Sequence, residues 1–108
     1  MKKLRPLVII LCLWPSVLFL SPAADLPHSF QPRDGFVPDE QTAIRIAHAV
    51  WFPIYGEKHI LSEAPFVATL KDGIWTVQGS LPKGRTGGVA IAEIAQQDAR
   101  IIRVSHGK

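Results

Sequence analysis

The histidines are the first candidates for chemistry, and they are widely spaced along the chain: His28, His48, His59 and His106. A zinc site needs three or four convergent ligands, and the sequence has neither an HExxH pair nor a cysteine beyond Cys12. His48 lies three residues from Arg45 on the polar side of an expected helix. We therefore expect His48, His59 and His106 to be solvated surface residues, and we expect no metal site and no cofactor.

Nucleophilic and acid-base catalysis find equally little support. The sequence has no GxSxG signature, and Ser62, Ser80 and Ser105 fall where turns and strand ends are expected. The pair Asp39 and Glu40 suits the start of a helix, where acidic side chains face the positive end of the helix dipole. The sequence therefore predicts no catalytic residue, and the protein is expected not to be an enzyme.

Four basic residues are candidates for binding a protein partner. Lys83 and Arg85 lie in the glycine-rich segment 82–88. This segment resembles an anion-binding loop, but it connects two expected strands, whereas a phosphate-binding loop precedes a helix. Arg100 and Arg103 lie on the expected outer strand, whose unpaired backbone groups could pair with a partner, although these charges also discourage such pairing.

The large aromatic residues leave two interpretations open. Trp75 falls on a central strand and is expected in the core. Trp51 and Tyr55 are four residues apart near the helix end, so they share one face. They either form an exposed anchor for a protein partner or cover the end of the sheet.

The hydrophobic pattern predicts one helix followed by four strands. Helix start signals at 38–40 precede an apolar stripe of Ala43, Ile46, Ala47, Val50 and Ile54, and Pro53 is expected to end the helix near Phe52. The period then changes to two, and Asp72-Gly73 indicates a hairpin turn. The expected strands are 66–71, 75–79, 89–95 and 100–105. The expected fold class is α+β, with one amphipathic helix on a four-stranded antiparallel sheet.

The N-terminal segment predicts export. Lys2, Lys3 and Arg5 precede an apolar run that is too short to span a membrane, and small residues follow at 21–24. We therefore expect a cleaved signal peptide over residues 1–24, an extended tether over 25–36 and a single domain over 37–108. The expected location is the periplasm or the exterior, with no stable membrane span after cleavage.

Removing the signal peptide changes the charge that matters. The full chain has 12 Lys and Arg against 9 Asp and Glu, and the signal peptide carries three of the cations. The remaining domain is neutral, which gives no basis for nucleic-acid binding. Cys12 leaves as well, so the domain folds without a disulfide.

Several segments together resemble the NTF2-fold immunity protein family of bacterial polymorphic toxin systems. They are 37–44, 53–58, the hairpin 65–79, the loop 81–90 and the tail 102–108. The resemblance implies an NTF2-like or cystatin-like fold and a non-enzymatic protein that binds a toxin. The family usually has glycine at the position of Ala99, so we expect a different backbone conformation in that turn.

Three functions therefore stay open. The first is an exported immunity protein that neutralises a toxin by stoichiometric occlusion. The second is a structural or peptidase-regulating envelope module, and the third is a small-ligand-binding domain of NTF2-like type. The residues predicted to contact a partner are Trp51, Tyr55, Lys83, Arg85, Arg100 and Arg103. The oligomeric state is not predicted.

Overall fold

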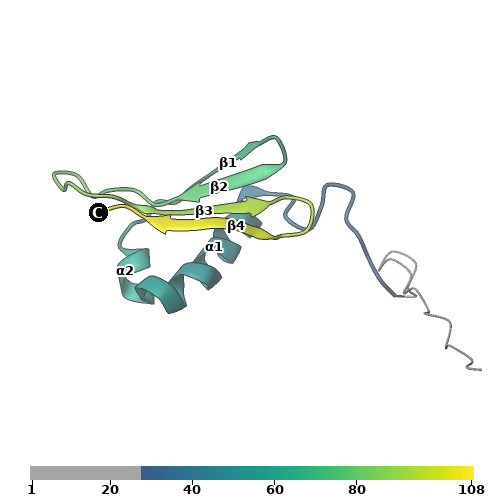
Figure 1. Cartoon of the computed structure of the whole chain (residues 1–108), viewed down its shortest axis with the longest axis horizontal. Helices are drawn as coiled ribbons and strands as arrows, with labels where there is room; N and C mark the ends of the chain where they lie inside the picture. The colour runs from purple at the N-terminus through teal and green to yellow at the C-terminus, as the bar shows by residue number, and fades with distance from the viewer. Residues whose placement is uncertain (1–27) are drawn as a thin grey trace, which may run out of the picture.

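The computed structural model describes residues 28–108, and the predicted signal peptide lies outside them. The described residues form two helices and a four-stranded sheet, and the helices lie on one side of the sheet (Figure 1). Their bounds are α1 Glu40–Tyr55 and α2 Glu57–Leu61, and the strands are β1 Val67–Lys71, β2 Ile74–Gln78, β3 Ala90–Ala95 and β4 Ile101–His106. No helix of this part of the chain is long and apolar enough to cross a membrane.

Helix α1 begins where its capping residues predict. The Asp39 carboxylate accepts hydrogen bonds from the Thr42 backbone N–H at 2.8 Å and from the Thr42 hydroxyl at 2.7 Å. These bonds lower the pKa of Asp39. The helix ends three residues later than predicted, at Tyr55, because Pro53 falls in the last turn and costs only one backbone bond there. The Gly56 N–H then closes the helix on the Phe52 carbonyl at 2.9 Å.

Helix α2 is a second departure from the prediction, which placed a loop after α1. Gly56 has φ 92, a conformation that favours glycine, and it allows the chain to turn and start a new helix at Glu57. Ile60 of α2 is fully buried. A five-residue helix with two apolar side chains, Ile60 and Leu61, is too short a pattern for a periodicity argument to detect.

The sheet is the predicted antiparallel meander, in the order β1-β2-β3-β4. Asp72 and Gly73 both have positive φ, as the expected two-residue hairpin turn requires. A bulge between Glu93 and Ile94 shifts the pairing of β3 with β4. Beyond it, Ala99 has φ 65, so alanine adopts the left-handed conformation that glycine favours rather than the different one expected.

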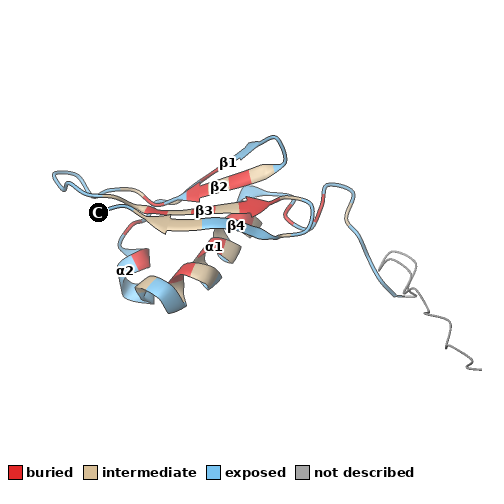
Figure 2. Ribbon diagram, in the orientation of Figure 1, coloured by how far each residue is buried: buried red, intermediate tan, exposed pale blue. Residues whose placement is uncertain are grey.

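The core lies between α1 and the covered face of the sheet (Figure 2). Ala43, Ala47 and Trp51 are the buried residues of α1, whereas Ile54 of the predicted stripe is 57% exposed. Trp75 is buried as predicted, and its indole N–H donates to the Val37 carbonyl at 2.7 Å. The small helix residues allow the helix and sheet to approach closely, and the two tryptophans supply much of the buried volume.

The residues before α1 contact the end of the sheet where β3 turns into β4. The backbone N–H groups of Phe36 and Val37 donate to the carbonyls of Gln97 and Gln96, both at 3.0 Å. Val37 is fully buried. Residues 35–37 therefore pack against the β3–β4 turn and help to fix the start of α1.

Candidate functional site

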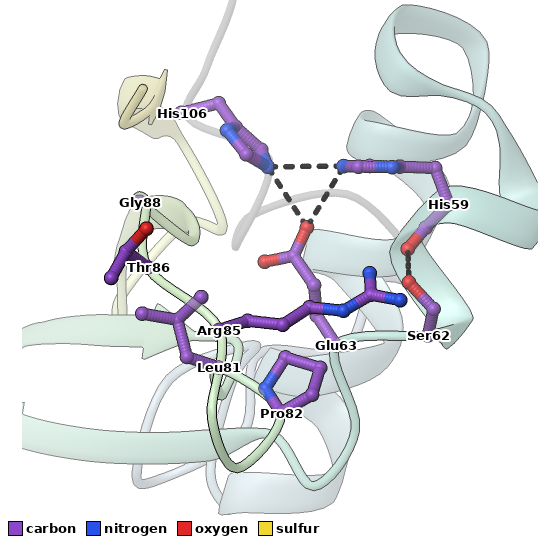
Figure 3. A pocket seen from close by; sticks show the side chains of 9 residues that line it. All are labelled: His59, Ser62, Glu63, Leu81, Pro82, Arg85, Thr86, Gly88 and His106. Atoms are coloured by element: carbon purple, nitrogen blue, oxygen red, sulfur yellow. Dashed lines mark hydrogen bonds and ion pairs between the residues drawn. The ribbon is translucent and has the colours of Figure 1, made fainter.

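Three polar side chains from distant parts of the sequence converge where α2 meets the end of β4. His59 belongs to α2, Glu63 follows that helix by two residues, and His106 is the last residue of β4. Figure 3 shows the three side chains pointing toward one another beside the loop 81–88. We call them the His-Glu-His cluster.

Glu63 is the centre of the cluster and is only 6% exposed. One carboxylate oxygen, Oε1, accepts a hydrogen bond from the Ala90 N–H at 2.8 Å. The other, Oε2, lies 2.9 Å from Nε2 of His106 and 3.3 Å from Nε2 of His59. A buried carboxylate is costly unless it is paired, and here both oxygens have partners.

Gly79 makes room for this carboxylate. A Cβ at position 79 would lie 2.7 Å from Oε1 of Glu63 and 2.8 Å from its Cβ, so any larger residue would displace the side chain. The Glu63 carbonyl also accepts from the Ser80 N–H at 2.6 Å. The segment after β2 therefore fixes both the backbone and the side chain of Glu63.

His106 is held through both ring nitrogens. Its Nδ1 lies 2.7 Å from the Gly107 carbonyl, which can only accept, so Nδ1 carries a proton. A hydrogen bond from Nε2 to Glu63 then requires the charged imidazolium. Accordingly, the Glu63 hydrogen bond is the main cause that raises the pKa of His106, with a further contribution from Gly107.

His59 completes the cluster from the solvent side. Its Nε2 lies 3.3 Å from Nε2 of His106, and its side chain is 57% exposed. A cavity of about 150 Å³ adjoins the three side chains, and Arg85 and Thr86 of the loop also line it. The cluster therefore combines a buried anion, two imidazoles and access from solvent.

The chain was compared with protein families and with known proteins. The family model described as NTF2 fold immunity protein matches residues 42–108, which include nearly all of α1 and everything that follows. The chain belongs to the NTF2-fold immunity protein family. Searches of curated proteins and of solved structures found no match.

Membership of the immunity family supports a general role in neutralising a toxin and implies a toxin as partner. It also suggests a role without catalysis. The four-stranded antiparallel sheet with its helices is consistent with an NTF2-like fold. The match includes all three residues of the His-Glu-His cluster.

Trp51 and Tyr55, the aromatic residues predicted to contact a partner, differ in burial. Trp51 is fully buried, and its indole N–H is directed at the Ile91 carbonyl at 3.4 Å. Trp51 belongs to the core of this immunity protein, so the interpretation of Trp51 as an exposed anchor for a partner is wrong. Tyr55 is half-buried, and its ring centroid lies 5.1 Å from that of His106.

The four basic candidates do not form a single patch. Lys83 and Arg85 lie in the loop at one end of the sheet, and Arg100 lies in the turn at the other end. Arg100 pairs with Asp98 at 3.3 Å, and Arg103 pairs with Glu93 at 2.9 Å. Of the four, only Arg85 lines the cavity beside the His-Glu-His cluster.

The prediction of solvated histidines is wrong for His48 and His106. The His48 ring stacks on Phe52 at a centroid distance of 5.3 Å and meets Phe66 edge-on at 4.4 Å. Its Nε2 is buried and has no hydrogen-bond partner in the described part of the chain, and desolvation lowers its pKa. Phe66, which follows α2, packs against the side of α1 that carries His48. This side of the helix is therefore not fully solvated, although the sequence predicted that it would be.

The sequence indicates that two of the three cluster residues lie close together, but not the third. His59 and Glu63 are four residues apart, a spacing that places two side chains on one side of a helical turn. His106 is 43 residues beyond Glu63, and only the β3–β4 pairing of Ala90 with His106 brings it to the same place. Helix α2 and that register are both needed to bring the three residues together, and neither is visible in the spacing of the histidines.

Proposed function

We propose that this protein is exported and neutralises a toxin by binding it stoichiometrically, without turnover. The match of the immunity family model to residues 42–108 carries this proposal. The short apolar run near the N-terminus supports export, because its length and flanking residues suit a cleaved signal peptide.

The uncovered face of the sheet is the surface that best suits such a partner. Both helices lie on the other side, as Figure 1 shows. Cross-strand pairing aligns Thr69, Thr76, Glu93 and Arg103 in one row across all four strands. Neighbouring residues in such a row point to the same side of the sheet, and this row alternates with the buried residues Ala68, Val77 and Ala92.

The composition of this row fits an interface that forms and dissociates. Thr69 and Arg103 are exposed, and Thr76 and Glu93 are half-buried. Interfaces between proteins that also exist separately are about as polar as the rest of the surface, and arginine is enriched in them. The Arg103–Glu93 pair holds the guanidinium in place at the β4 end of the row.

The test is co-expression with candidate toxins, taken from the genes that neighbour the one for this protein, with survival and co-purification both measured. We expect survival together with a one-to-one complex. Arg103→Glu is expected to lose both, whereas the matched reversal Arg45→Glu on the exposed side of α1 is expected to keep both. Survival without a complex would contradict occlusion, and failure of both with the unchanged protein would favour the envelope-module alternative.

Export is tested separately by fractionation and intact mass. We expect the protein recovered from the periplasm to begin at Ala24 or Asp25. A recovered mass that retains residues 1–23 would contradict cleavage.

A further inference from the structure

The His-Glu-His cluster offers three metal-ligand atoms in one place. Nε2 of His59, Nε2 of His106 and a carboxylate oxygen of Glu63 all lie within 4.8 Å of one another. Two imidazoles and one carboxylate suit a first-row transition metal, because imidazole favours zinc, copper, iron and nickel. Calcium and magnesium instead require mostly oxygen ligands.

The separations fit the coordination sphere of zinc. Ligand atoms about 2.0–2.2 Å from zinc at tetrahedral angles lie about 3.3–3.6 Å from each other. The His59–His106 and His59–Glu63 distances are both 3.3 Å. The His106–Glu63 distance is 2.9 Å, so that pair would open by a few tenths of an ångström.

The second contacts of the ligands hold two of them in the orientation that a metal needs. Nδ1 of His106 faces the Gly107 carbonyl, which leaves Nε2 as the ligand atom once it releases its proton to solvent on metal binding. Oε1 of Glu63 faces the Ala90 N–H, which leaves Oε2 directed at the histidines. Hydrogen bonds of this kind to ligating histidines and carboxylates are characteristic of metal sites.

We propose that His59, Glu63 and His106 bind one zinc ion, with a fourth coordination position open to the adjoining cavity. Because the His59 side chain is exposed, a zinc ion can reach the site from solvent. In metal sites with three protein ligands, water or another group takes the fourth position. Zinc binding at this site does not require a toxin to be present.

Arg85 lines the same cavity without offering a ligand atom. As a cation close to the site, it opposes the binding of a second cation. Arg85→Ala therefore alters the cavity but keeps the proposed ligands, and it is expected to bind zinc at least as tightly as the unchanged protein. It is a matched control for the ligand variants, and His28→Ala is a second control because it removes a histidine outside the cluster.

The experiment is a calorimetric titration of the untagged protein with Zn²⁺, repeated with Co²⁺ for its absorption spectrum. We expect one ion per chain, and about tenfold or more weaker binding in His59→Ala and in His106→Ala. Because His59 is largely exposed, its removal is expected to leave the fold intact, as circular dichroism would verify. The two controls are expected to keep the affinity.

Two results would overturn the proposal. The unchanged protein could fail to bind zinc, in which case the cluster is an ion pair around a buried carboxylate. Alternatively, binding could persist in both ligand variants or fall equally in Arg85→Ala, in which case the ion binds elsewhere or responds to the cavity as a whole.

Discussion

His48 and His106 are the same residue type in opposite surroundings. His48 lies among Trp51, Phe52 and Phe66, and its buried Nε2 has no partner within the described residues. His106 bonds through both nitrogens, to Gly107 and to Glu63. Burial lowers the pKa of the first, whereas the Glu63 hydrogen bond raises the pKa of the second. The comparison shows that a histidine becomes part of a site when the fold brings an acceptor to it.

The largest expected effect is that of Trp51→Ala, which removes an aromatic ring beside His48. The Trp51 ring is fully buried and lies 5.9 Å from Phe66 and 6.2 Å from His48. We expect the free energy of unfolding to fall by about 3–5 kcal/mol, measured by chemical denaturation. The control Ile54→Ala, on the exposed side of the same helix, should change it by less than about 0.5 kcal/mol. Equal effects would contradict the assignment of Trp51 to the core.

Glu63→Gln tests the polar surroundings of His106 while keeping the shape of the side chain at position 63. It removes the charge that pairs with His106, so we expect a loss of about 1.5–3 kcal/mol of stability, measured at pH 6 with a chelator present. The exposed Glu57→Gln on α2 is the matched control and should be nearly neutral. If both variants were equally stable, Glu63 would not be the centre of the cluster.

His48→Phe is expected to have the opposite effect and to stabilise the protein. A phenyl ring keeps the contacts with Phe52 and Phe66 and removes the unpartnered Nε2. We expect a gain of about 1 kcal/mol in the free energy of unfolding at neutral pH. A loss of stability would show that Nε2 has a polar partner that the described residues do not reveal.

The smallest effects are expected in the dependence of stability on pH, where the two histidines act with opposite signs. The folded pKa of His48 lies below its usual 6.5, so its contribution is present above pH 6.5 and is lost as the pH falls through the folded value. The folded pKa of His106 lies above 6.5, so its contribution is present below pH 6.5 and is lost as the pH rises through the folded value. NMR titration of the ring protons in the presence of a chelator measures the pKa of each histidine. Shifts in the same direction would contradict the opposite surroundings assigned to His48 and His106.

The sequence predicted most of the fold because its signals are local. Asp39 caps α1, Asp72-Gly73 closes the hairpin, and alternation marks the strands. The candidate site was missed because its determinants are not local. Glu63 can be buried because Gly79 has no side chain to occupy the same space. His106 lies beside it because of the register of β4 against β3. His48 was misjudged for the same reason, since Phe66 covers it from outside its own helix.

The most direct test of the difference between the two histidines is a crystal structure of the protein grown with zinc, with anomalous data on both sides of the zinc edge. We predict one strong peak about 2.0–2.2 Å from Nε2 of His59, Nε2 of His106 and Oε2 of Glu63, and none beside His48. A structure without a peak at the His-Glu-His cluster, or with its strongest peak elsewhere, would contradict zinc binding by these three residues.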